Sequence, residues 1–354
     1  MDIERLNNAE PDRLAVWVIT PKGRGLGVRI KNNVQGSALF VPNAVSQEVA
    51  PESNIFGFDT LGLEIKRRFH HFSGHVFIFS TGIAVRLIAP LLKSKMTDPA
   101  VVVVDDNGTH VVSLISGHIG GANALTHKIA RILHALPIIT TATDTNGLPA
   151  IDVIAKEKNF YIETPRNIKR INMAFLTGKP VDIHDPLGLI ENELHGISLM
   201  KGSFQDPSLE KIYCSHETGA VSRETMVLRP PVLSVGIGCN MGTGVEDIYD
   251  FLIFVFREGN LSMHSIKRIA TIDLKKNEPG LLSLAEKMNL PLDFHTREAL
   301  NSVTSIETPS PMVEKHVGVK SVSEASAILS AGHGRLIITK KKNKDVTIAV
   351  AIEK

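Results

Sequence analysis

The run from residue 100 to residue 141 constrains the fold more than any other part of the chain. Ala100–Val104 and His110–Leu114 are short apolar runs typical of strands, and Asp105–Gly108 between them is typical of a hairpin turn. A helix follows, with apolar side chains at helical spacing from Leu125 onward, and Pro137–Thr141 is the next strand. A strand–helix–strand unit makes its two strands parallel. This run therefore predicts an α/β sheet.

The same alternation extends toward the N-terminus and predicts the domain organisation. Further strands are expected at Leu14–Thr20, Ser37–Val41 and His75–Phe79. We predict a multi-domain α/β protein: an N-terminal α/β domain (1–146), a small irregular central domain (147–229) and a C-terminal α/β domain (230–354). A chain of 354 residues is long enough for two or three domains.

The C-terminal segment carries its own start and stop signals. Successive prolines in LRPP indicate a linker, and the strand VLSVGIGC follows. The turn GIGCNMGTG has Met241 where a dinucleotide fingerprint needs its third glycine, which argues against NAD. Thr243 with Glu246 and Ser321 with Glu324 are predicted capping boxes. The chain should close with a β-hairpin.

Charge and cysteine content exclude several classes of protein. A formal net charge of +2 gives no bulk attraction to nucleic acid or to anionic lipid. Two cysteines cannot form a disulfide framework or a zinc cluster. The polar start MDIERLNNAEPDR lacks the features of a secretory signal, and no apolar run is long enough to span a bilayer. We expect a cytoplasmic protein without nucleic-acid or membrane partners.

Two polar loops follow consecutive strands of the N-terminal domain. The first runs from Ser116 to Asn123 and the second from Thr140 to Gly147. If the preceding strands are parallel, both loops lie at one sheet edge and could line a cleft. Glycines let the first loop approach a ligand, and free amides at a helix start can hold anionic oxygens. The alternative is structural, with glycine-rich and threonine-rich turns that cap their helices.

His118 lies inside the first loop, and the ordinary pKa of histidine suits proton transfer near neutral pH. The other histidines of this domain, among them His75, are expected at the surface or at a sheet edge. Arg86 lies in an apolar helix, where its guanidinium either reaches solvent or binds a carboxylate. Cys239 has no evident base partner.

Several motifs together resemble a known family. STGIAVRLIAPLL, TDPAVVVVDDNG, SLISGHIGGANALTHKIA and ITTATDTNGLPAIDV resemble the N-terminal half of the CbiG family. SVGIGCNMGTGVEDI, ATIDLKKNEPGLLSLAEKMNLPL and TPSPMVEKHVGVKSVSEASAIL resemble the C-terminal domain that this family shares with CobE-type proteins. The resemblance covers nearly the whole chain except the central stretch, and NMGTG departs from the basic residues that are more usual in that loop.

The resemblance implies an enzyme of anaerobic cobalamin biosynthesis. Such a hydrolase opens the ring A lactone of cobalt-precorrin 5A and releases acetaldehyde, giving cobalt-precorrin 5B. Cobalt is carried by the substrate, so no cofactor and no protein metal site are expected. Neighbouring enzymes of the corrin pathway are candidate partners, and a homo-oligomer is left open. Two alternatives are a non-catalytic carrier of a corrinoid intermediate and, ranked last, a chelatase-like protein, which lacks close ligand pairs.

We assign physical roles to the loop residues on this basis. His118 is the predicted acid or base, Ser116 with the Gly120 and Gly121 amides the predicted oxyanion donors, and Asp144 with Asn146 the predicted groups that orient water or His118. The remaining predicted site residues bind substrate: Arg86, Gly117, Gly120, Gly121, Asn123, Thr143, Asn146 and Lys275.

Overall fold

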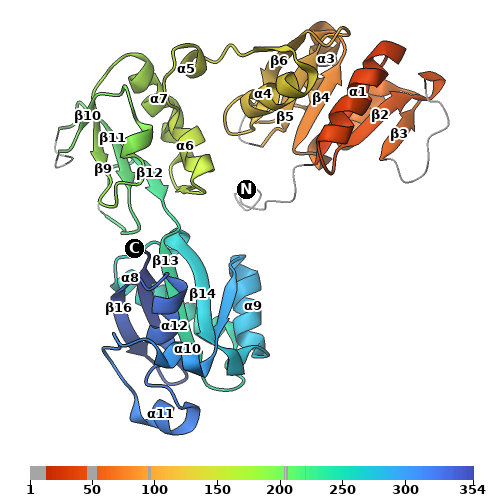
Figure 1. Ribbon diagram of the computed structural model, residues 1–354. Helices are drawn as coiled ribbons and strands as arrows, with labels where there is room; N and C mark the ends of the chain where they lie inside the picture. The colour runs from red at the N-terminus through yellow and green to blue at the C-terminus, as the bar shows by residue number, and fades with distance from the viewer. Residues whose placement is uncertain (1–12, 46–53, 95–96, 203, 205, 220) are drawn as a thin grey trace. The chain divides into compact units, whose positions relative to one another are not determined.

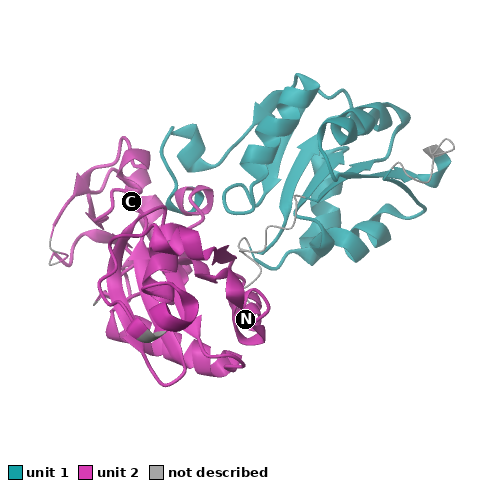
Figure 2. Cartoon of the chain, turned by 60° about the horizontal axis from the view of Figure 1, so that its bottom comes forward, with its two compact units in different colours: residues 1–153 teal, residues 154–354 magenta. Residues whose placement is uncertain are grey.

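The structure is a computed structural model that describes residues 13–45, 54–94, 97–202, 204, 206–219 and 221–354. The chain divides into two compact units, residues 1–153 and 154–354 (Figure 2). The predicted hairpin at residues 105–108, the helix near residue 125 and the C-terminal hairpin are all confirmed. The multi-domain α/β class is also confirmed, since each of the three sheets described contains parallel strand pairs.

The described part of the first unit forms a seven-stranded sheet in the order β3-β2-β1-β4-β5-β6-β7 (Figure 1). β5 and β6 are antiparallel, whereas β6 and β7 are parallel in the register Val111 to Pro137. The carboxyl ends of β6 and β7 therefore lie at one edge of the sheet, as predicted. The strands are β1 (Leu14–Val18), β2 (Ala38–Pro42), β3 (Ile55–Phe58), β4 (Gly74–Ile78), β5 (Ala100–Val104), β6 (His110–Ile115) and β7 (Leu136–Ile138).

Helices cover both faces of this sheet. On one face, Ile30 and Ile129 pack on an aliphatic core that includes Val102, and Figure 1 shows their helices α1 and α4 side by side. On the other face, Ile65 and Ile88 pack on aromatic side chains of the strands. Burial of the strands on both sides explains their continuous apolar runs. The helices are α1 (Pro21–Asn33), α2 (Leu61–Arg68), α3 (Thr81–Ile88), α4 (Ala122–Leu133), α5 (Ala142–Thr145) and α6 (Ile151–Glu157), the last crossing the division between the units.

One prediction for this unit is wrong. His75 is completely buried on β4, among aromatic rings that include Trp17 and Phe69. Trp17 Nε1 donates a hydrogen bond to His75 Nδ1 at 3.1 Å, and His75 Nε2 lies 2.9 Å from the Phe69 carbonyl oxygen. Both ring nitrogens thus have partners inside the protein, which makes burial of this polar ring tolerable.

The second unit contains two five-stranded sheets among its described residues. The first has the order β10-β9-β11-β12-β8, and α7 (Ile168–Leu176) buries Ile168, Ile171 and Phe175 along one side. Its strands are β8 (Tyr161–Ile162), β9 (Val181–His184), β10 (Leu199–Met200), β11 (Glu210–Cys214) and β12 (Met226–Arg229).

The second sheet of this unit has the order β15-β14-β13-β17-β16. Its strands are β13 (Leu233–Cys239), β14 (Ile266–Ile272), β15 (Leu292–His295), β16 (Arg335–Lys342) and β17 (Val346–Ile352). Its helices are α8 (Val245–Glu258), α9 (Pro279–Met288), α10 (Arg297–Asn301), α11 (Pro311–Val317) and α12 (Val322–Ser330).

The two predicted capping boxes have different outcomes. Ser321 caps α12 as predicted, with its hydroxyl accepting the Glu324 amide. The Glu324 carboxylate does not return to Ser321 but accepts amides from Thr308 and Lys340. The box at Thr243 is wrong, because α8 begins after Gly244 and the Thr243 hydroxyl donates to the Asn240 carbonyl. The Thr243 hydroxyl is bonded to this nearer carbonyl in the preceding turn and so does not cap α8.

Candidate functional site

The loops after β6 and β7 meet around His118. His118 Nε2 lies 3.2 Å from Asp144 Oδ2 and 3.0 Å from the Thr143 hydroxyl. The His118 side chain is 21% exposed, so the ring is reachable from solvent yet held by its neighbours. The structure therefore brings His118 and Asp144 together, as expected of parallel neighbouring strands.

A second carboxylate contacts the same ring. Asp152, in the first turn of α6, is buried and places Oδ2 3.5 Å from His118 Nδ1. The hydrogen bond with Asp152 is the largest cause that raises the pKa of His118, and the charges of Asp152 and Asp144 add to it. Burial of the ring acts in the opposite direction. The imidazolium form is thereby favoured.

Asp152 is a residue of this site that was not predicted from the sequence. Its carboxylate lies in the first turn of a short helix, which is an ordinary place for an acidic residue. Because Asp152 stands beyond the polar loop that ends at Gly147, no local pattern links it to His118. Only the return of the chain through α5 brings the two side chains together.

Asp144 is oriented through one of its two carboxylate oxygens. Oδ2 accepts hydrogen bonds from Thr141 Oγ1 at 2.6 Å and Asn123 Nδ2 at 3.1 Å, in addition to the contact with His118. Oδ1 has no hydrogen-bond partner within the described part of the chain, and the side chain is 38% exposed. A carboxylate held in this way presents one free oxygen in a defined direction.

Asn123 acts inside this network and is buried. Its side-chain oxygen accepts from the Ser113 hydroxyl at 2.7 Å, and its amide also donates to Thr141 Oγ1 at 2.9 Å. Both polar side-chain atoms of Asn123 thus have protein partners, and its contact with substrate stays a prediction. Thr143 is also buried and bonds to His118. Both residues position the catalytic candidates.

Ser116 and Gly120 form the other wall of the first loop. Ser116 has φ of 60°, a left-handed conformation that costs energy for a non-glycine residue, and its buried Oγ has no hydrogen-bond partner in the described structure. A Cβ on Gly120 would lie 2.2 Å from Ser116 Cβ, so only glycine fits. The Gly120 amide donates no hydrogen bond to any described residue. One hydroxyl and one amide thus remain as donors.

The structure also bears on the predictions for Gly121 and Gly117. The Gly121 amide is not free, because it donates to the His118 carbonyl at 2.8 Å and closes the turn before α4. A Cβ on Gly117 would lie 2.8 Å from Asn123 Oδ1, so this glycine makes room for the network. Its role is to allow close packing.

Three predicted site residues are not brought into these contacts. Arg86 is exposed on α3 and forms no hydrogen bond or ion pair through its side chain with any described residue. Asn146 donates to the Ala142 carbonyl at 2.8 Å and so completes the end of α5. Lys275, in the second unit, forms an ion pair of 2.8 Å with the buried carboxylate of Glu278.

In the described ranges, no group of three or more His, Cys, Asp and Glu side chains is arranged to hold a metal ion. None of the described helices has both the length and the apolar character required to cross a bilayer.

Family models match three consecutive segments of the chain. The family model for the N-terminal part of cobalamin synthesis G matches residues 64–144, that for the central region matches 149–230, and that for the C-terminus matches 233–351. A crystal structure of CobE, from the cobalamin pathway, has a TM-score of 0.33 at 31% identity and covers 35% of this chain and 91% of its own.

Two relatives named cobalt-precorrin-5A hydrolase match at nearly full length. The relative from Priestia megaterium is 33% identical and covers 96% of this chain and 94% of its own length. The relative from Salmonella typhimurium is 32% identical, with 98% and 99% covered. With matches of this extent in all three segments, the chain belongs to the CbiG family of cobalamin synthesis proteins.

Proposed function

We propose that this chain is a cobalt-precorrin-5A hydrolase of cobalamin biosynthesis, which opens the ring A lactone and releases acetaldehyde. The support is the near-full-length match to two relatives that carry this name. The alternative of a non-catalytic carrier is not favoured by these matches. A cytoplasmic location and an association with neighbouring enzymes of the corrin pathway stay predictions.

The reaction sets three chemical requirements. Water must be deprotonated as it attacks the lactone carbonyl, and the tetrahedral oxyanion must be stabilised. The oxygen released by ring opening must then leave as an alkoxide, which becomes the oxygen of acetaldehyde. The carbon–carbon bond that joins the bridging carbon to the macrocycle then breaks, and its electron pair goes to the macrocycle. The bridging carbon and its methyl group leave as the aldehyde.

The contacts around His118 favour a division of roles between two groups. Both ring nitrogens lie against carboxylates, so we assign His118 as the imidazolium acid that protonates the leaving alkoxide. The neutral ring then takes the proton back as the carbon–carbon bond breaks. Asp144, with Oδ1 unbonded, is the base that accepts a proton from water. The convergence of three side chains on Asp144 Oδ2 is the observation that carries this assignment.

Ser116 and Gly120 of the first loop supply the candidate oxyanion donors. Ser116 Oγ and the Gly120 amide are without partners among the described residues. We assign them to the developing negative charge on the lactone oxygen. A single donor of this kind is typically worth roughly 10²–10³ in kcat.

The activity test uses the purified full chain with cobalt-precorrin 5A and measures acetaldehyde. We expect release by the wild-type chain and a loss of about 10²–10⁴ in kcat for Asp144→Asn and for His118→Asn. His127→Asn is the matched control, because His127 is exposed on α4 and its side chain forms no hydrogen bond or ion pair with any described residue. Binding without acetaldehyde would support the carrier, and full activity in His118→Asn would reject the assigned acid.

A further inference from the structure

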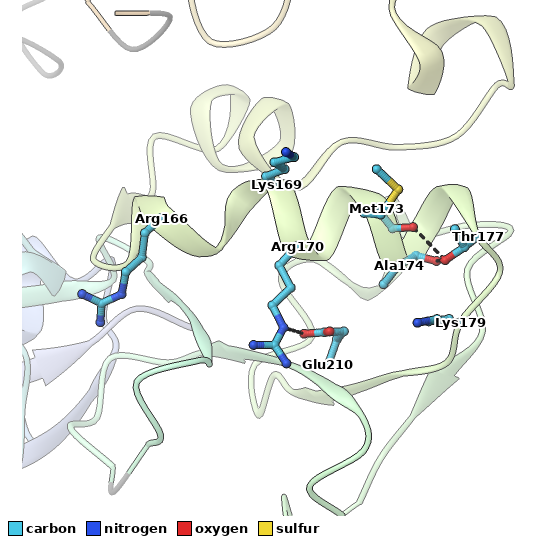
Figure 3. A pocket seen from close by; sticks show the side chains of 8 residues that line it. All are labelled: Arg166, Lys169, Arg170, Met173, Ala174, Thr177, Lys179 and Glu210. Carbon is cyan, nitrogen blue, oxygen red and sulfur yellow. Dashed lines mark hydrogen bonds and ion pairs between the residues drawn. The ribbon is translucent and has the colours of Figure 1, made fainter.

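A second set of charged side chains lies in the other unit, on the exposed face of α7. A pocket of about 360 Å³ is bordered there by four cationic side chains and one carboxylate, together with smaller residues (Figure 3). This volume is at the small end of the range for small-molecule sites, roughly 300–1,000 Å³. We call it the α7 pocket; its lining is Arg166, Lys169, Arg170, Met173, Ala174, Thr177, Lys179 and Glu210.

The cations gather because of helical spacing. Arg166, in the turn just before α7, lies three residues before Lys169 and four before Arg170, a spacing that makes side chains neighbours, and all three border the pocket. The opposite side of α7 is apolar and buried. Lys179 follows the helix end, and Figure 3 shows its amino group directed back toward the region of Glu210. The chain as a whole has a net charge of only +2, so this excess is local.

Most of these cations lack a carboxylate partner. Arg170 is paired, through Nε with Glu210 and through a terminal nitrogen with Glu224 at 3.0 Å. Arg166 donates only to the Arg223 carbonyl, at 3.4 Å. Lys169 and Lys179 have no ion-pair partner in the part of the chain described. Like charges at this helical spacing repel one another, and a bound anion removes that cost.

The lining also indicates the kind of anion. Met173 and Ala174 add an apolar surface beside the cationic groups. Arginine and lysine together suit carboxylates, which accept both forked and single charge-assisted hydrogen bonds. A short alkyl arm that ends in a carboxylate matches this combination of an apolar wall and ammonium groups. Acetate and propionate arms of a corrinoid have that form.

We propose that the α7 pocket binds carboxylate side arms of the corrinoid. This inference rests on the proposed function for the class of ligand, and it assigns the recognition of carboxylates to the central segment. The pocket is too small for a whole macrocycle, so it takes one or two arms. Binding there is electrostatic in part and should weaken as salt is added.

The test measures binding to the full chain without turnover. The probes are cobyrinic acid, whose arms are free carboxylates, and cobinamide, whose arms are amidated. The pocket variant is Lys169→Gln with Lys179→Gln, because both lysines are exposed and neither holds a partner needed for folding. The matched control is Lys315→Gln with Lys320→Gln, which removes the same charge from exposed positions outside the pocket.

We expect the wild-type chain to bind cobyrinic acid more tightly than cobinamide. The pocket variant should bind cobyrinic acid about tenfold more weakly, while the control variant stays within about twofold of wild type. Equal affinity in the pocket and control variants overturns the proposal. Binding of inorganic phosphate that is lost in the pocket variant, with cobyrinic acid unaffected, also overturns it, because the site is then one for small inorganic anions.

The acetaldehyde assay separates this proposal from the proposed function. If the wild-type chain releases no acetaldehyde but the binding pattern holds, the hydrolase assignment fails and the carboxylate site stands. If acetaldehyde is released and the pocket variant keeps wild-type binding of cobyrinic acid, the site fails alone. With both correct, the wild-type chain releases acetaldehyde and the pocket variant binds cobyrinic acid about tenfold more weakly than the control variant does.

Discussion

Asp144 and His118 are each held by several neighbouring side chains. Three donors bind a single oxygen of Asp144, and two carboxylates flank a single imidazole. Each arrangement restricts the residue to one orientation, and the two carboxylates favour the imidazolium form of His118. The expected consequence for His118 is a raised pKa, which the pH dependence of the reaction reports directly.

Replacing Asp152 by Asn tests the protonation form of His118. An acid must be protonated, so activity falls as pH rises through its pKa, and the raised pKa places this fall above the ordinary value for histidine. Asp152→Asn removes the largest cause of the raised pKa, so the alkaline fall in kcat/KM should move to lower pH. A profile that instead rises with pH through this region would make His118 a base.

At the scale of single elements, β4 depends on the uncharged form of a buried histidine. Burial lowers the pKa of His75 to about 4, and the neutral ring accepts from Trp17 and donates from Nε2 to Phe69. Charging this ring inside the aromatic cluster would remove its acceptor and leave a cation without solvent. The stability of the first unit should therefore depend on pH through this residue.

The sign of that dependence follows from the lowered pKa. The unfolded chain binds a proton near the ordinary pKa of histidine, whereas the folded chain does so only near pH 4. The contribution of neutral His75 to the free energy of unfolding is complete above pH of about 6.5 and is lost as pH falls toward about 4. This contribution is on the order of 3 kcal/mol.

Urea unfolding of the full chain at several pH values measures this contribution. His75→Phe should be less stable near pH 7, because the Trp17 N–H loses its acceptor, yet it should lose less stability between pH 6.5 and pH 4 than wild type. His71→Phe, at an exposed neighbour, is the control and should follow the wild-type slope. An unchanged slope in His75→Phe would contradict the role given to His75.

At the scale of the whole molecule, the second unit is held together by a segment that serves both of its sheets. Residues 215–218 follow β11, and their backbone bonds to residues 260–262, with Thr218 N to Asn260 O at 2.7 Å and Ser262 N to His216 O at 2.8 Å. Arg229 is 2% exposed and donates to the Ser215 and Glu217 carbonyls of the same segment.

Arg229→Met should therefore weaken the second unit as a whole. Two carbonyl oxygens and the Glu163 carboxylate lose their donor, which costs about 3 kcal/mol in the free energy of unfolding. Amide hydrogen exchange should speed up in both sheets of this unit. Arg223→Met, at an exposed position two residues before Thr225, is the control; faster exchange confined to β12 would show that the two sheets unfold separately.

The sequence by itself determined the local elements of this protein. The hairpin at residues 105–108, the helix α4 and the cap at Ser321 were predicted, because each depends on residues within a few positions. The parallel pair β6 and β7 was predicted from the strand–helix–strand order. The motifs also predicted the family that the comparisons later showed. The meeting of His118 with Asp144 followed from strand direction alone.

Only the tertiary structure decided what surrounds each side chain. Asp152 reaches His118 through the return of the chain after α5, and His75 is buried because rings from β1 and from the segment before β4 enclose it. Thr243 bonds to a nearer carbonyl instead of capping α8. Hydrogen bonds and burial depend on distance in space, and residues far apart in sequence come within that distance only when the elements have packed.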